Sequence, residues 1–145
     1  MAQGDPIPDT DHVARYCRKE TLNDEGFPDG TAFRLRPGKD RYVSVNWLEH
    51  FGTTDKNAQL ASIRADMQIK PGAQAKLAVL NVRETRDYVK NKDLEHLSLC
   101  FLHEPEPDDL SHSGIHNLPL NDKDRQEILA DLIAECAREC YPAKG

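Results

Sequence analysis

The segment from His103 to His116 concentrates side chains capable of chemistry. It carries three histidines and four acids, namely His103, His112, His116, Glu104, Glu106, Asp108 and Asp109. Two prolines and a glycine interrupt the segment, which predicts a loop rather than a helix or a strand. Loops that gather titratable groups are common sites of binding and catalysis.

Imidazole and carboxylate groups are the usual protein ligands of zinc, manganese and iron. One hypothesis is therefore a small metal-dependent hydrolase, in which His103, His112 and His116 hold a divalent metal ion beside an open position. Glu104 or Asp109 would act as the general base toward a metal-bound water, whose pKa such an ion lowers. The spacing matches no recognised metal signature, so a solvated acidic loop explains the same residues.

A second chemical candidate is Cys17, which has three cations near it in the sequence. They are Arg15, Arg18 and Lys19. Neighbouring cations lower the pKa of a thiol and favour the nucleophilic thiolate, and His112 or His12 would supply the base that such a nucleophile needs. No signature of a cysteine enzyme surrounds Cys17, and a small apolar residue in a first strand is the alternative interpretation.

A third polar group lies where a strand pattern passes into a helical one. Its members are Ser44, Asn46, Trp47, Glu49 and His50. We interpret Asn46 as a helix N-cap and Trp47 as a core anchor. Neither a glycine-rich phosphate loop nor a nucleophile elbow occurs here, so this group predicts structure rather than chemistry.

The composition favours a globular protein of the cytoplasm. The 145 residues suit one domain with its own core, and 38% apolar with 30% charged residues is a polar globular balance. The net charge of −6 disfavours a general role on nucleic acid. We find no apolar run long enough to cross a membrane, no secretory signal and no zinc-finger spacing among the four cysteines. We therefore expect a reduced, cytoplasmic protein.

Charge is unevenly distributed along the chain. Residues 33–41 are basic, with the charged side chains Arg34, Arg36, Lys39, Asp40 and Arg41. By contrast, the stretch 104–139 holds ten acids and three bases. Such segregation fits recognition of an oppositely charged partner, and a solvated surface with ordinary charge scatter explains the same pattern. The leading hypothesis is a small binding or accessory protein that acts through a protein partner, contacted by Arg34, Arg36 and Arg41. Whether the chain is an enzyme stays open at this point.

Periodicity predicts strands and helices behind a flexible arm over residues 1–11. Strands are expected at 12–17, 32–36, 42–45, 77–82 and 96–102, of which the second and third form a hairpin. Helices are expected at 55–67 after a Thr54 N-cap, around Val89, and from an Asn121 N-cap to Cys140. Residues 12–145 would form a single α+β domain, with a mixed four- or five-stranded sheet and two main helices packed on it.

Overall fold

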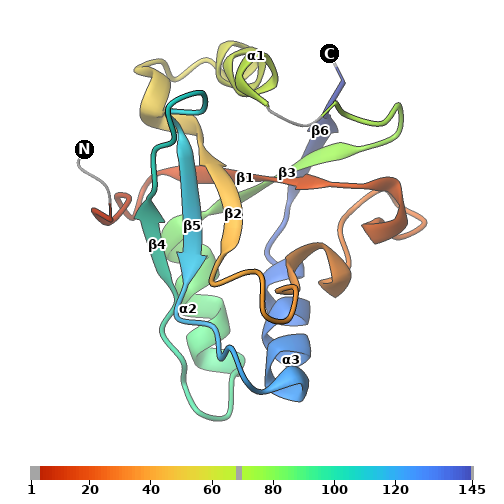
Figure 1. The fold of residues 1–145 in the computed structure, drawn as a ribbon, viewed down its shortest axis with the longest axis vertical. Helices are drawn as coiled ribbons and strands as arrows, with labels where there is room; N and C mark the ends of the chain where they lie inside the picture. The colour runs from red at the N-terminus through yellow and green to blue at the C-terminus, as the bar shows by residue number, and fades with distance from the viewer. Residues whose placement is uncertain (1–3, 68–69, 145) are drawn as a thin grey trace.

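The computed structural model describes residues 4–67 and 70–144 and has the expected α+β architecture (Figure 1). Three α-helices pack on one sheet, which has six strands in these ranges rather than four or five. The strands are β1 (His12–Cys17), β2 (Val43–Trp47), β3 (Lys76–Asn81), β4 (Cys100–His103), β5 (His112–His116) and β6 (Glu139–Pro142). The α-helices are α1 (Lys56–Asp66), α2 (Val82–Lys92) and α3 (Lys123–Ala134). Three 3-10 helices complete the list: η1 (Lys19–Thr21), η2 (Gly30–Phe33) and η3 (Leu48–Phe51).

The strand order is β4-β5-β2-β1-β3-β6, and the pairing is antiparallel throughout rather than mixed. The strand predicted at 77–82 is confirmed as β3. Its residues from Leu77 to Leu80 are all buried, as expected for a strand covered on both faces. β1 pairs with β3 along its whole length, so these two strands form the centre on which both cores rest.

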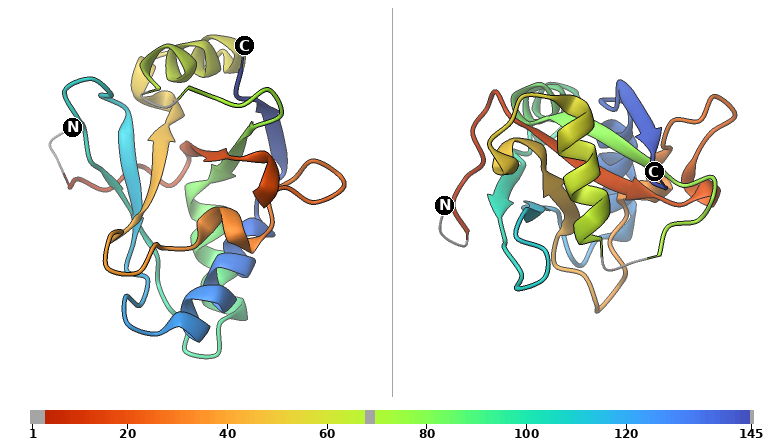
Figure 2. Two further views of the ribbon diagram at one scale, coloured as in Figure 1. Left: turned by 45° about the vertical axis from the view of Figure 1, so that its right-hand side comes forward. Right: turned by 90° about the horizontal axis from the view of Figure 1, so that it is seen from above.

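Each face of the sheet has its own core, because successive strand residues point to opposite faces. On the large-core face, α2 and α3 cover the sheet, and Leu80 lies in one cluster with Leu129 and Ile133. On the small-core face, α1 and η3 pack over β1 and β3, where Val79 shares a cluster with Leu60 (Figure 2). These two helices do not extend over β2, β5 and β4, whose small-core side carries mostly polar side chains.

Two helices are capped one residue after the predicted position. Asp55 accepts a hydrogen bond from the Ala58 N–H (3.0 Å) and is the N-cap of α1 in place of Thr54. Asp122 is the N-cap of α3 in place of Asn121. A carboxylate satisfies the free N–H groups of a first turn and also favours the positive end of the helix dipole.

The predicted hairpin over 32–36 and 42–45 is wrong in its first strand. Residues 30–33 instead form η2, and the adjacent Ala32 and Phe33 are both buried. Burial of two consecutive residues on one side suits a helical turn better than a strand, whose side chains alternate. The second strand forms as β2, which pairs with β1 and β5.

The last predicted helix is too long. α3 ends at Ala134, Cys136 lies beyond it, and Cys140 belongs to β6, which pairs with β3. A spacing of four residues returns a side chain to the same face in a strand as well as in a helix, so the pattern did not separate the two. Pro142 lies in an edge strand, where a missing N–H is tolerated.

The chemically rich segment is a β-hairpin rather than a loop. The strand expected at 96–102 begins only at Cys100, and residues 112–116 form β5. Glu106 and Asp109 close the connection with two backbone hydrogen bonds of 3.1 and 3.0 Å. Because β5 lies between β2 and β4, pairing on both sides stabilises a strand whose own propensity is weak.

The N-terminal segment also differs from the prediction. Of residues 4–11, expected within a flexible arm, the first four lie along β4, where the Ile7 N–H donates to the Phe101 carbonyl oxygen (2.9 Å), and Asp9 and Asp11 bind the first residues of α2. Ile7 is buried in the large core. Burial of this one apolar side chain, together with backbone pairing at a sheet edge, outweighs the proline-rich composition. Residues 1–3 of the predicted arm lie outside the described residues.

Candidate functional site

The small-core side of β2, β5 and β4 forms a polar surface that we call the open sheet face. The residues on it are Tyr42, Ser44, Asn46, Cys100, Leu102, Glu104, His112, Gly114 and His116, of which Leu102 is apolar. The strand register brings them together, because Asn46 pairs with His112 and Cys100 pairs with His116. Within the described ranges no helix lies over this surface (Figure 1). Three paired strands therefore position these groups on a rigid support.

Tyr42 and His116 occupy the middle of the open sheet face. Their rings stack with centroids 4.5 Å apart and planes 28° apart. Gly114 leaves the room for both rings, since a Cβ there would lie 2.8 Å from Tyr42 Cγ and 2.9 Å from His116 Nε2. His116 Nε2 is 3.5 Å from Glu104 Oε1. Burial lowers the pKa of His116, and Glu104 opposes that shift, so the imidazole is mainly neutral at neutral pH and able to accept a proton.

His112 is oriented by the backbone of the opposite strand. Its Nδ1 lies 2.8 Å from the Glu104 carbonyl oxygen and donates a hydrogen bond to it. Nearby, the Asn46 amide donates to Asp109 Oδ1 (2.8 Å) and to Ser111 Oγ (2.9 Å). Burial raises the pKa of Asp109, although His112 and this hydrogen bond act in the other direction. These contacts order the connection between β4 and β5.

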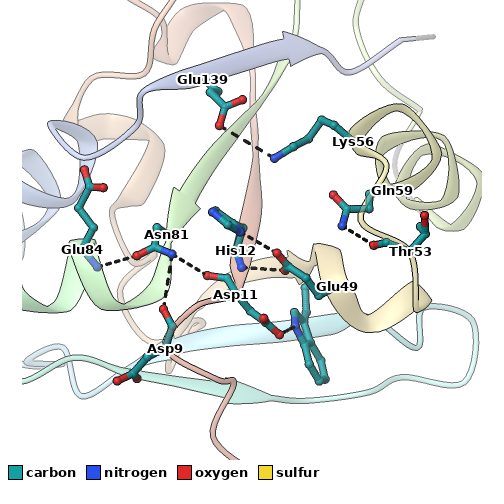
Figure 3. A network of polar contacts seen from close by, with 11 residues as sticks. Asp9, Asp11, His12, Glu49, Thr53, Lys56, Gln59, Asn81, Glu84 and Glu139 are labelled. Carbon is teal, nitrogen blue, oxygen red and sulfur yellow. Dashed lines mark hydrogen bonds and ion pairs between the residues drawn. The ribbon is translucent and has the colours of Figure 1, made fainter.

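A second polar network surrounds His12 at the start of β1 (Figure 3). Glu49 accepts a hydrogen bond from the His12 backbone N–H (2.8 Å), and its other oxygen lies 2.6 Å from His12 Nδ1. Burial alone would raise the pKa of Glu49, but the hydrogen bonds from His12 outweigh it and lower that pKa. The carboxylate fixes Nδ1 as the protonated nitrogen, and Figure 3 shows Nε2 pointing away from Glu49.

The same network joins the start of β1 to three further elements of the fold. The Trp47 indole N–H donates to Asp11 (2.8 Å), and the Asn81 amide donates to the Asp11 carbonyl oxygen (3.2 Å). Asn81 also caps α2 by accepting from the Glu84 N–H (2.8 Å). The contacts thus tie β1 to β2, β3 and α2, and they account for Trp47 as an anchor. The local sequence predicts a structural role for Glu49 but gives no sign of its partner His12, because 37 residues separate the two.

The chain was compared with protein-family models, curated proteins and solved structures, and none of them matches it. Within residues 4–67 and 70–144, no helix is both long enough and apolar enough to cross a membrane.

His103, one of the three predicted metal ligands, lies on the opposite side of the sheet from the other two. It pairs with Ser113 in the register, faces the large core and is only 2% exposed. Its ring packs edge-on against Trp47 (centroids 5.2 Å apart) and lies 5.3 Å from that of His50. Its Nε2 is 2.8 Å from the Leu110 carbonyl oxygen. These contacts give His103 a packing role beneath the hairpin.

The predicted ligand set of His103, His112 and His116 is therefore not brought together. Adjacent positions of a strand point to opposite faces, so a residue paired with Ser113 does not meet its neighbour His112. In the described part of the chain, no group of three His, Cys, Asp or Glu side chains has the arrangement of a metal site. Of the two predicted general bases, Glu104 lies beside His116 and Asp109 lies in the hairpin connection.

Cys17 is buried at the end of β1 on the large-core face. Burial raises the pKa of its thiol to about 12, which outweighs the opposing effect of Arg15. The thiol donates to the Arg15 carbonyl oxygen (3.3 Å). Loss of solvation thus has a larger effect than the nearby cations at this position, which disfavours the thiolate of Cys17. The interpretation of Cys17 as a small apolar residue fits its surroundings.

The predicted partner-binding residues lie in the connection between η2 and β2, residues 34–41, which we call the basic loop. Asp40 accepts hydrogen bonds from the Arg36 backbone N–H (2.8 Å) and from its guanidinium (3.0 Å twice). Gly38 has a positive φ of 71° and allows the turn between them. Arg36 is therefore partly neutralised within the loop and closes it.

Arg15 of β1 clamps the two ends of the basic loop. Its Nε donates to the Ala32 carbonyl oxygen and its Nη1 to the Ser44 carbonyl oxygen, both at 2.8 Å. Leu35 adds an apolar anchor, because its side chain is buried in the large core. The loop is thus held at both ends and near its start, while Arg34, Lys39 and Arg41 are exposed.

Proposed function

We propose that this chain is a small cytoplasmic binding protein that recognises an acidic surface of a protein partner through the basic loop. The observation that carries this proposal is the closed and clamped backbone of the loop. Arg36 is paired with Asp40, whereas no ion pair within the described residues engages Arg34, Lys39 or Arg41. Three cations are therefore presented together on a fixed support.

Preorganisation gives this arrangement its value for binding. A flexible loop loses conformational freedom when a partner orders it, and each immobilised long side chain adds about 0.5–1.5 kcal/mol to that cost. The Arg36–Asp40 contacts and the hydrogen bonds of Arg15 already order the loop backbone in the folded protein. Less backbone freedom is therefore lost when a partner binds. Exposed charges act mainly on association rate and specificity, so we propose steering of an acidic partner rather than tight binding by charge alone.

The state of the cysteines supports the proposed cytoplasmic location. All four, Cys17, Cys100, Cys136 and Cys140, are unpaired thiols. Free thiols are the normal form of cysteine in the reducing cytoplasm, whereas secreted domains of small size commonly depend on disulfides.

A titration with a short polyglutamate peptide, followed by residue-resolved NMR, tests the proposal directly. We expect the largest shifts at Arg34, Lys39 and Arg41, and weaker binding as salt rises, because exposed charges are screened. The double variant Arg34→Ser/Arg41→Ser should weaken binding by roughly three- to tenfold, since two exposed ion pairs are worth a few tenths of a kcal/mol to about 1 kcal/mol each.

Lys90→Ser/Lys92→Ser is the matched control, because it removes the same charge from an exposed part of α2. The control should bind the peptide as the natural chain does. Equal weakening in both double variants would show that net charge alone drives binding, and it would overturn the proposal. The same two variants apply to any protein partner, for which the loop variant should lower the association rate at low salt.

A further inference from the structure

Cys100 differs from the other three thiols of the chain in its surroundings. It is exposed, whereas Cys17 and Cys136 are buried and Cys140 is half-buried. Burial raises the pKa of Cys17 to about 12 and the pKa values of Cys136 and Cys140 to about 11 each. Only the thiolate is nucleophilic, so these three sulfur atoms are protected in the folded protein. Cys100 is the thiol that meets solvent.

An imidazole lies directly across the strand pair from Cys100. Cys100 of β4 and His116 of β5 are register partners, so both side chains stand on the open sheet face. Side chains that oppose one another in an antiparallel pair have Cβ atoms about 4.5–5.5 Å apart. A thiol and an imidazole at that separation come within reach through side-chain rotation alone.

Two side chains contact the His116 ring, and a glycine leaves room for it. Tyr42 stacks on it at 4.5 Å, Gly114 leaves space beneath it, and Glu104 lies 3.5 Å from its Nε2. The Glu104 backbone is itself fixed, because its carbonyl oxygen binds His112 Nδ1. Nε2 of His116 is a buried atom that makes no hydrogen bond within the described residues, because the 3.5 Å contact with Glu104 is an ion-pair distance and not a hydrogen bond.

One charged side chain near Cys100 is already engaged in an ion pair. Arg86 of α2 lies within electrostatic reach of Cys100, and its guanidinium is bound to Asp9 at 2.9 Å. The group facing Cys100 that is both neutral and able to accept a proton is His116, whose pKa burial lowers.

We propose that Cys100 is a reactive thiol that exchanges with low-molecular-weight disulfides, with His116 as its base and Glu104 as a positioning residue. His116 takes the proton of the Cys100 thiol, and the thiolate attacks one sulfur atom of the disulfide. A new bond forms between Cys100 Sγ and that sulfur, the disulfide bond breaks, and the departing thiolate takes the proton from His116. The products are a mixed disulfide on Cys100 and one free thiol, so the disulfide is the oxidant and the balance is complete.

The test uses oxidised glutathione as the probe and mass spectrometry of the intact and digested chain as the readout. We expect one adduct, on Cys100, before any forms on Cys140. His116→Gln should slow this adduct by about tenfold or more, because the thiolate is then formed without an adjacent base. The pH profile of the rate should also move toward that of an unassisted thiol. Glu104→Gln should move the profile in the same direction and by less.

His50→Gln is the control variant, because it removes a partly buried histidine on η3 away from Cys100. It should react as the natural chain does. Thermal melting of each variant checks that the fold is retained, and a variant that unfolds is replaced by His116→Asn. Equal adduct rates on Cys100 and Cys140, or an unchanged pH profile in a folded His116 variant, would overturn the proposal.

Discussion

His12 and Glu49 are joined by two hydrogen bonds, one from the backbone N–H and one from the imidazole of the same residue. This pair fixes η3 against the start of β1. Glu49→Gln keeps the shape but loses the charge that strengthens both bonds, so we expect it to destabilise the protein by about 1–2 kcal/mol. Urea unfolding at neutral pH measures this cost. Glu25→Gln, a change at an exposed turn, is the control and should be neutral.

The same pair predicts a dependence on pH. The folded-state pKa of Glu49 is lowered from its ordinary value of 4.5. Its contribution is therefore present above the ordinary pKa and is lost as the pH falls through the folded-state pKa. The stability difference between the natural chain and Glu49→Gln should shrink on the acid side of pH 4.5. A difference that stays constant down to the acid transition would contradict the ionised pair.

Asp93 and Arg125 form the most buried ion pair between α2 and α3. Asp93 is 2% exposed, binds both terminal nitrogens of the guanidinium, and accepts from the Leu97 N–H at 2.9 Å. Asp93→Asn removes the charge and leaves Arg125 with the exposed Glu95. We expect a loss of about 2–4 kcal/mol, near the lower end for a broken buried pair because Arg125 is partly solvated.

The contribution of the Asp93–Arg125 pair to stability is also lost as the pH falls, as for the His12–Glu49 pair. The hydrogen bonds from Arg125 lower the pKa of Asp93 from 3.8 to about 2. Its contribution is present above pH 3.8 and is lost as the pH falls toward about 2. Unfolding curves of the natural chain and of Asp93→Asn should therefore converge near pH 2. Asp87→Asn is the control, since its ion pair with Arg83 is exposed on both sides, and it should change stability little.

The elements that could be predicted from the sequence are those with strong apolar patterns. β3 and α3 were found because Leu77 to Leu80 and the stripe through Leu129 and Ile133 are buried by neighbours on every side. β5 was missed because its residues, including Gly114, have little strand propensity of their own. Its extended backbone is imposed by β2 and β4, and pairing over such distances leaves no local signal.

The candidate sites also differ in how much of each could be predicted from the sequence. The basic loop was visible in the sequence because its charges are contiguous, whereas the exposure of Cys100 was not, because Cys100 lies in an apolar run. The His116 partner of Cys100 and the Glu49 partner of His12 were not visible, because each pair depends on strand register. The grouping of His103 with His112 failed for the same reason, since closeness in sequence does not decide the face of a sheet.

Gly114 lies under the Tyr42 ring, and this contact predicts a coupled pair of substitutions. A Cβ at residue 114 would stand 2.8 Å from Tyr42 Cγ, so the ring would have to move. Gly114→Ala should cost about 1–3 kcal/mol, the usual range for overpacking. In a Tyr42→Ala background the same change should cost clearly less, because the obstructing ring is absent. A double-mutant cycle by chemical denaturation measures the coupling, and equal costs in both backgrounds would exclude the contact.

The separation of His103 from His112 and His116 predicts that no metal ion held by these three residues stabilises the fold. Adding zinc, manganese or iron, or removing metal with a chelator, should leave the melting temperature unchanged. His103→Ala should nevertheless destabilise the protein by about 2–4 kcal/mol, since it empties the space beside Trp47 and leaves the Leu110 carbonyl oxygen without its donor. Substitution of the part-exposed His116 by alanine should cost less. A chelator-dependent fall in melting temperature that disappears in His103→Ala would show instead that the three histidines share an ion.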